Sequence, residues 1–341
     1  MISTFSKPHN EDSTKSAAMQ TDKNLSGKVI VVTGASSGAG RAIALAFART
    51  GAQLVLAARR EQTLAEVAEE CEQAGSTALI VPTDVTDAAA VQNLAEAALN
   101  FGGRIDVWVN NAGVLAAGAF EETPISVHDQ VIRTNLMGYL HGAHAVLPYF
   151  KDQGYGILIN NISVGGYIPA PNAVGYAASK FGLRGFSQSL KGELYKWPHI
   201  HVCDVYPGFL DTPGMQHAAN YTGRYIKPAP PVYDPQRVAN TIVELARHPQ
   251  EAVTVGGAAI FLRLSNLVAP GLTRRMAALL MDGYLKKAEP LPYTPGNVLL
   301  PVEYGTSIHG GWNSQADARK RKKTALLIAG AVAGLLLLRR L

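Results

Sequence analysis

Short apolar runs alternate with longer helical stretches from Lys28 onward, and this alternation leaves the chain few possible folds. The runs are VIVV, QLVLAA, TALIVP, IDVWVN, GILINN, HIHVCDVYP and EAVTVGGAAIFL. Apolar residues recur at helical spacing between them, in residues 41–49, 61–74, 88–101, 128–149, 176–197 and 235–247. Strands that alternate with helices form βαβ units, so the pattern predicts an α/β protein with a parallel sheet.

The ends of the chain differ in composition from this central part. No linker-like stretch interrupts residues 27–285, which we expect to form one domain. Residues 1–26 are polar and lack the apolar segment of a secretory signal, so we expect a disordered leader. Residues 286–318 are rich in Pro and Gly, which favours an extended arm over a second domain.

The first predicted strand ends in a glycine-rich sequence, TGASSGAG. Such a turn lets backbone N–H groups approach a pyrophosphate, whose charge the following helix N-terminus stabilises. Gly34 is expected to make the turn, Gly38 the close approach and Gly40 a tight contact between helix and strand. The G-x₃-G-x-G spacing departs from the commoner G-x-G-x-x-G, but its place after the first strand predicts a dinucleotide site.

The second predicted strand ends in LAARRE and indicates which dinucleotide is bound. An acid at this point binds a ribose 2′-hydroxyl, whereas an arginine accommodates a 2′-phosphate. Ala57 and Ala58 occupy the expected acid position, and Arg59 and Arg60 follow them. The sequence therefore favours NADP over NAD.

Seven motifs in order give the chain a family resemblance. They are TGASSGAG, DVTD, NNAG, TNLMG, NISVGG, YAASK and YPGFLDT. Together they resemble the classical short-chain dehydrogenase/reductase family, closely over residues 28–212 and more loosely to about 285. The resemblance implies a doubly wound Rossmann fold with a parallel seven-stranded sheet, followed here by a C-terminal extension.

The resemblance also implies roles for individual residues. The catalytic set would be Asn135, Ser163, Tyr176 and Lys180. The pyrophosphate of the cofactor would contact Gly34, Ser36, Ser37, Gly38 and Gly40, and its 2′-phosphate would contact Arg59 and Arg60. The adenine would lie between Asp84 and Val85, and the adenosine ribose beside Asn111, Ala112 and Gly113. Pro207, Gly208 and Thr212 would lie near the nicotinamide, and Tyr176 and Lys180 would also contact the cofactor.

The YAASK motif suits proton transfer to a carbonyl oxygen. Tyr176 and Lys180 are four residues apart and share one face of a helix. A free phenol has a pKa near ~10, and a nearby ammonium is expected to lower it. Ser163 would hold the substrate oxygen, and Asn135 a water that connects Lys180 to solvent.

These features predict an NADP(H)-dependent oxidoreductase that interconverts a hydroxyl and a carbonyl on a small molecule. Phe209, Met215, Tyr167 and Tyr221 fall in segments expected near the substrate, which favours a lipophilic one. Two alternatives remain: epimerisation or dehydration by the same residues, and a non-catalytic, membrane-tethered cofactor-binding protein. A homo-oligomer is compatible with either an enzyme or a binding protein.

The basic charge of the chain lies in its tail. Seven Lys and Arg fall in residues 319–341, so without them the net charge of +5 becomes slightly negative, which argues against a nucleic-acid partner. The apolar stretch 325–338 lies between basic clusters and favours a C-terminal anchor, with the enzyme on the cytoplasmic side of a membrane. The alternative is a tail packed on protein in a cytoplasmic enzyme. No His or Cys spacing predicts a metal site.

Overall fold

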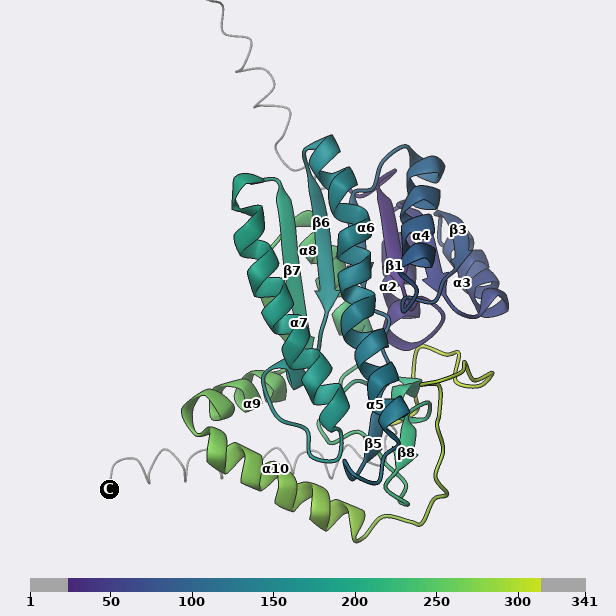
Figure 1. The fold of residues 1–341 in the computed structure, drawn as a ribbon. Helices are drawn as coiled ribbons and strands as arrows, with labels where there is room; N and C mark the ends of the chain where they lie inside the picture. Colours follow the sequence, from purple (N-terminus) through teal and green to yellow (C-terminus); the bar gives the residue numbers. More distant parts are fainter. Residues whose placement is uncertain (1–23, 314–341) are drawn as a thin grey trace, which may run out of the picture.

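A seven-stranded parallel sheet forms the centre of the computed structural model, which describes residues 24–313 (Figure 1). The strand order is β3-β2-β1-β4-β6-β7-β9. The strands are β1 Val29–Thr33, β2 Gln53–Ala58, β3 Thr77–Pro82, β4 Val107–Asn110, β6 Gly156–Asn161, β7 Ile200–Pro207 and β9 Ala252–Val255. The order reverses between β1 and β4, and in doubly wound sheets ligands bind beyond the carboxyl ends at this point.

Helices cover both faces of the sheet, as the apolar strand sequences predict. Figure 1 shows α4, α6 and α7 in front of the sheet and α8 behind it. One face packs on α2 Gly38–Ala48, α3 Glu61–Gln73 and α8 Pro235–Arg247, and the other on α4 Ala88–Gly102, α6 Gly138–Gln153 and α7 Val174–Glu193. The predicted doubly wound α/β fold is confirmed.

The helix expected over residues 128–149 is built in three parts. It comprises α5 (Ile125–Ile132), a π-helical turn (Arg133–Met137) and α6, which continues through Pro148 to Gln153. The helix therefore continues past the end that was expected at residue 149. Proline removes one backbone hydrogen bond, but Val146 and Phe150 on either side are fully buried, and their packing keeps the helix intact.

Two other expected boundaries also differ. The run EAVTVGGAAIFL is a strand only in β9, because Gly256 adopts a φ of 105° and helix α9 (Gly257–Val268) begins after it. Leu25, which the sequence placed in the leader, is 3% exposed and packs in the core. The rest of that leader, residues 1–23, lies outside the described residues.

The small sheet and the C-terminal segments lie beyond the carboxyl ends of the main strands. Strand β5 (Ala116–Gly118) pairs in parallel with β8 (Ala219–Tyr221). Helix α10 (Pro270–Leu285) follows α9, and the arm then runs as the yellow-green trace from α10 towards β8 in Figure 1. The expected anchor, 325–338, lies outside the described residues, and no helix within 24–313 is long and apolar enough to cross a membrane.

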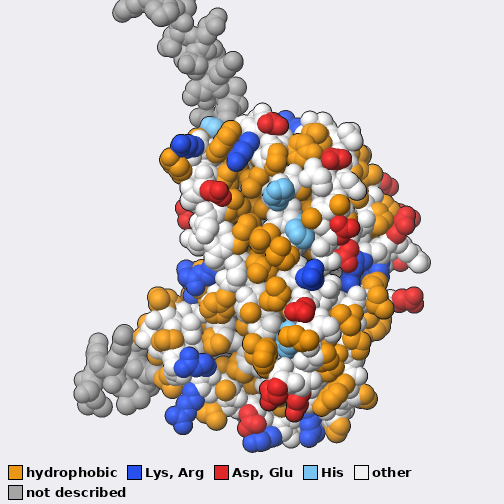
Figure 2. All heavy atoms as spheres, in the orientation of Figure 1, with side chains coloured by type: hydrophobic (Ala, Val, Ile, Leu, Met, Phe, Trp, Pro, Cys, Tyr) orange, Lys and Arg blue, Asp and Glu red, His pale blue; other side chains and the backbone are white. Residues whose placement is uncertain are grey.

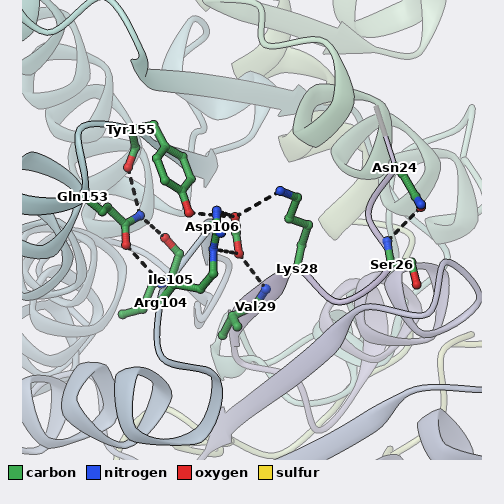
Figure 3. Close-up of polar contacts among 9 residues, drawn as sticks. All are labelled: Asn24, Ser26, Lys28, Val29, Arg104, Ile105, Asp106, Gln153 and Tyr155. Atoms are coloured by element: carbon green, nitrogen blue, oxygen red, sulfur yellow. Dashed lines mark hydrogen bonds and ion pairs between the residues drawn. The ribbon is translucent and has the colours of Figure 1, made fainter. Parts of the chain in front are cut away.

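A polar cluster around Asp106 holds the opposite end of the sheet together (Figure 3). Asp106 is 5% exposed, and its carboxylate accepts the backbone N–H of Val29 over 2.9 Å. Arg104 pairs with it at 2.6 Å, Tyr155 donates its hydroxyl over 3.0 Å, and Lys28 lies at 3.8 Å. These contacts join the starts of β1 and β4 to the segment before β6.

Candidate active site

A cavity of about 1830 Å³ opens at the carboxyl ends of the strands. Every catalytic and cofactor residue expected from the sequence lines it except Asn135. Asn135 has no exposed surface, and a Cβ placed at Gly113 would lie 3.3 Å from its Oδ1 and 3.9 Å from Lys180 Nζ. Asn135 is therefore a neighbour of Lys180 at the back of the cavity wall.

Ser163 and Tyr176 meet in this cavity. Ser163 follows β6, Tyr176 lies in the first turn of α7, and a side-chain hydrogen bond joins them. Ser163 Oγ also accepts the Gly165 N–H over 3.0 Å, so its own hydrogen stays free to be donated. The φ of Ser163 is 135°, a conformation rare outside glycine, and such strain gathers at functional positions.

Lys180 lies one helical turn after Tyr176 and is 4% exposed. Its Nζ lies 5.2 Å from the ring centre of Tyr139 and 5.6 Å from that of Tyr176. Burial lowers the pKa of Lys180 to about 7, because the ammonium loses its hydration.

The pKa of Tyr176 moves in the opposite direction to the one expected from the sequence. Burial raises it above its ordinary value, and the hydrogen bond with Ser163 only partly opposes that rise. The expected lowering by Lys180 is therefore wrong, because desolvation of the phenol dominates. The result is a neutral phenol, the form that can give a proton to a carbonyl oxygen.

The glycine loop has the shape that a pyrophosphate requires. Gly34 has a φ of +66°, and a Cβ there would lie 2.7 Å from Ala112 Cα. A Cβ at Gly40 would collide with the Gly34 carbonyl, so helix α2 packs as closely on β1 as predicted. Gly38 has a φ of +54° and faces Thr212. Ser36 and Ser37 also line the cavity, so the loop fits a dinucleotide phosphate.

Asn111 ties the carboxyl ends of three strands together beside this loop. Its Nδ2 donates to the Thr33 carbonyl over 3.0 Å, and its Oδ1 accepts from Asn161 Nδ2 over 2.8 Å. Asn111 therefore braces the sheet beside the cavity. Ala112 and Gly113 continue this wall of the cavity.

The arginine doublet lies at the end of β2, as expected. Arg59 Nη2 donates to the Asn297 carbonyl over 2.7 Å, and Arg60 Nη1 donates to the Val302 carbonyl over 2.5 Å. Burial lowers the pKa of Arg59, and nearby Asp84 opposes that change. Five N–H groups per guanidinium leave donors for an anion at both residues.

The remaining residues, which the resemblance places at the adenine and near the nicotinamide, also line the cavity. Asp84 Oδ1 accepts the N–H and hydroxyl of Thr86, at 2.9 and 2.8 Å, and Val85 is 8% exposed. Pro207 ends β7, and the N–H of Gly208 donates to the Val255 carbonyl over 3.0 Å. Thr212 and Gly208 both line the cavity.

Apolar side chains from α9 and α10 form a wall that sequence reasoning missed. They are Phe261, Leu264, Val268, Leu272, Met276 and Leu280. Figure 2 shows apolar side chains with basic ones among them over the lower part of the molecule, where these helices lie. Of the four residues expected near the substrate, Phe209 and Met215 line the cavity, whereas Tyr167 and Tyr221 do not. Phe261, Leu264 and Val268 recur at i, i+3 and i+7, a helical spacing that could have marked α9, but the run EAVTVGGAAIFL was expected to be a strand.

Three residues of the arm, Asn297, Pro301 and Val302, also line the cavity and were not expected. Their stretch has no helical or strand periodicity, so only tertiary contacts reveal its position.

The short chain dehydrogenase family model matches residues 28–222. The uncharacterized oxidoreductase YxnA of Bacillus subtilis (strain 168) is 33% identical over 324 residues, which cover 92% of this chain and 90% of that protein. The 11-beta-hydroxysteroid dehydrogenase A of Sesamum indicum is 35% identical over 192 residues, covering 56% of this chain and 54% of that protein.

Two solved structures share the fold. A metagenomic short-chain oxidoreductase in complex with NADP is 31% identical, with a TM-score of 0.59, over 68% of this chain and 98% of that one. The alcohol dehydrogenase of the archaeon Thermococcus sibiricus, complexed with 5-hydroxy-NADP, is 29% identical, with a TM-score of 0.59. The match covers 67% of this chain and 95% of that one. This protein therefore belongs to the short-chain dehydrogenase/reductase family and is an oxidoreductase of that family.

Proposed function

We propose that this oxidoreductase uses NADP(H) to interconvert a hydroxyl and a carbonyl on a lipophilic small molecule. One observation carries the proposal: Ser163, Tyr176 and Lys180 share a cavity with the glycine loop and with Arg59. The two similar structures whose names include NADP or 5-hydroxy-NADP support the choice of cofactor.

The residues divide the reaction between them. When bound, NADPH supplies the hydride that reduces the carbonyl carbon. The Ser163 hydroxyl donates a hydrogen bond to the carbonyl oxygen and holds it in place. Tyr176 gives its phenolic proton to that oxygen, and the charged form of Lys180 stabilises the phenolate left behind. Proton and hydride together convert the carbonyl to a hydroxyl, and the reverse direction oxidises the alcohol.

The walls of the cavity support a lipophilic substrate. Leu264, Leu272 and Met276, on α9 and α10, line the same cavity as Tyr176 with apolar side chains. Each is partly exposed, at 53%, 42% and 47%, so a bound apolar molecule would cover surface that now faces water. The steroid dehydrogenase of Sesamum indicum supports testing polycyclic ketones alongside long-chain ones.

A Tyr176→Phe variant tests this proposal. It should lower kcat for NADPH-dependent ketone reduction by about 10²-fold or more, because the proton donor is lost, and leave the Kd for NADPH nearly unchanged. Tyr195→Phe, at a residue 74% exposed, is the matched control and should reduce ketones at the wild-type rate. Retained turnover in Tyr176→Phe would refute the assigned role. Turnover without net NADPH consumption would instead favour epimerisation or dehydration.

The membrane anchor over 325–338 is proposed from sequence alone, with the enzyme on the cytoplasmic side. Full-length protein should sediment with membranes without detergent, and a chain ending before Arg319 should stay in the supernatant. A full-length protein that remains in the supernatant would overturn the anchor and favour a tail packed on protein.

A further inference from the structure

The C-terminal arm crosses the cofactor edge of the cavity. Thr294 and Asn220 exchange two backbone hydrogen bonds, of 2.8 and 3.0 Å. Further along, the Ser307 carbonyl accepts the Gly38 N–H over 2.9 Å. One segment therefore links the small sheet to the phosphate loop, over the end of β2.

The arm is held firmly where it passes the arginine doublet. Val298 is fully buried in a cluster that includes Val114, Ala116 and the Tyr176 ring. The N–H of Asn297 donates to the His217 carbonyl over 2.8 Å, and His217 Nε2 lies 2.9 Å from the Tyr304 carbonyl. Together with the two arginine contacts, these interactions fix residues 297–304 beside the cavity, where Asn297, Pro301 and Val302 form part of its wall.

Asn297 is the residue of segment 297–304 that has a buried side-chain atom with no hydrogen-bond partner among the described residues. Its Oδ1 is buried without a hydrogen bond, although the residue lines the cavity. A buried carbonyl oxygen without a donor is destabilising, and such groups in folded proteins usually have a partner or a function. The backbone of Asn297 is fully used, because its N–H bonds His217 and its carbonyl bonds Arg59.

The missing partner must supply a hydrogen-bond donor. A 2′-phosphate offers acceptors only, so it suits Arg59 and leaves the Asn297 oxygen unpaired. An adenine ring carries an amine, N6, beside an acceptor, N7, and a carboxamide can bond both atoms at once. Asp84, which the resemblance places at the adenine, lines the same cavity as Asn297.

We infer that the Asn297 carboxamide binds the N6–N7 edge of the adenine of the cofactor, so that the arm supplies a recognition residue to the adenosine subsite. This inference rests on the proposed use of NADP(H). The Arg59 bond to the Asn297 carbonyl then has a second role, because one guanidinium both faces the 2′-phosphate site and positions the residue that recognises the base.

The direct test is the Kd for NADPH of an Asn297→Leu variant of the full chain, measured by titration calorimetry. Leucine keeps the size of the side chain and removes both hydrogen-bonding atoms. The Kd should rise about tenfold, while the melting temperature of the cofactor-free protein stays equal or rises, since an unpaired oxygen has gone. Leu300→Ala, on the same arm, 74% exposed and outside the cavity, is the control and should bind like wild type.

A base analogue identifies the contacted group. Nicotinamide hypoxanthine dinucleotide phosphate carries an oxygen in place of N6, so Asn297→Leu should weaken its binding much less than it weakens that of NADPH. An unchanged Kd for NADPH in Asn297→Leu overturns the inference, and equal losses for the two dinucleotides overturn the adenine assignment. Wild-type protein that binds no NADPH overturns the proposed function itself, so the two failures are distinguishable.

Discussion

Asn135 and Val114 exchange two hydrogen bonds. The Val114 N–H donates to Asn135 Oδ1 over 2.7 Å, and Asn135 Nδ2 donates back to the Val114 carbonyl over 2.9 Å. Nδ2 also lies 3.3 Å from Ser179 Oγ. The side chain expected to hold a water is thus already engaged, so a water at this point would have to bind the main chain of the π-helical turn.

Asn135→Ala should therefore impair catalysis through position. Loss of the side chain unpairs two buried backbone groups and loosens the turn behind Lys180, which should lower kcat about tenfold or more and stability by about 2 kcal/mol. The Kd for NADPH should change little, because Asn135 lies outside the cavity lining. Ser187→Ala, which removes a buried 2.6 Å bond to Asp204, is a stability-matched control and should keep kcat. If Asn135→Ala and Ser187→Ala have the same kcat, the role of Asn135 is purely structural.

The main sheet and most of the site follow from local sequence patterns. The glycine loop and the Arg59 doublet each follow a strand, and the carboxyl ends of parallel strands meet at one edge, so residues far apart in sequence line one cavity. The i, i+4 spacing of Tyr176 and Lys180 likewise places both on one face of α7.

Other features depend on tertiary contacts that no local pattern records. Arg59 and Asn297 are bonded across 238 residues, and the arm between them lacks periodicity. The pKa directions of Tyr176 and Lys180 follow from burial, which the full packing determines. The apolar composition of EAVTVGGAAIFL predicted one continuous strand, but the strand ends before Gly256, whose positive φ turns the chain into α9.

Arg59→Ala should shift cofactor preference towards NADH. It removes donors facing the 2′-phosphate site and releases the Asn297 carbonyl, so the Kd for NADPH should rise about 10²-fold while that for NADH changes much less. Arg274→Ala, on the exposed surface of α10, controls for the loss of one positive charge. The measurement is the ratio of the Kd for NADPH to the Kd for NADH. If Arg59→Ala leaves this ratio unchanged, Arg59 does not bind the 2′-phosphate.

Lys180→Met should alter stability in a pH-dependent way. The pKa of Lys180 is about 7 in the folded protein and close to its ordinary 10.5 when unfolded. Between these values the unfolded chain binds more protons, so the wild type becomes more stable as pH rises, by about 1.4 kcal/mol per unit. Below pH 7 the folded protein carries the full cost of a buried ammonium.

Urea unfolding at pH 6 and pH 9 checks this prediction. The stability advantage of Lys180→Met over wild type should be largest at pH 6 and smaller by about 3 kcal/mol at pH 9. Lys196→Met, at an exposed residue, should show no such change. A constant difference between Lys180→Met and wild type would mean that Lys180 keeps an ordinary pKa in the folded protein.

Asp106→Asn should destabilise the protein without altering its chemistry. The Asp106 carboxylate is 7% exposed and pairs with Arg104 at 2.6 Å, so the substitution weakens a buried charged network and should cost about 2–3 kcal/mol. Asp282→Asn breaks a 2.7 Å pair with Lys286, both more than half exposed, and should cost less than about 0.5 kcal/mol. Asp106 lies before β4, at the end of the sheet away from Tyr176, so kcat and KM per folded molecule should match wild type. A loss of kcat in Asp106→Asn at full folding would show that the two ends of the sheet are coupled.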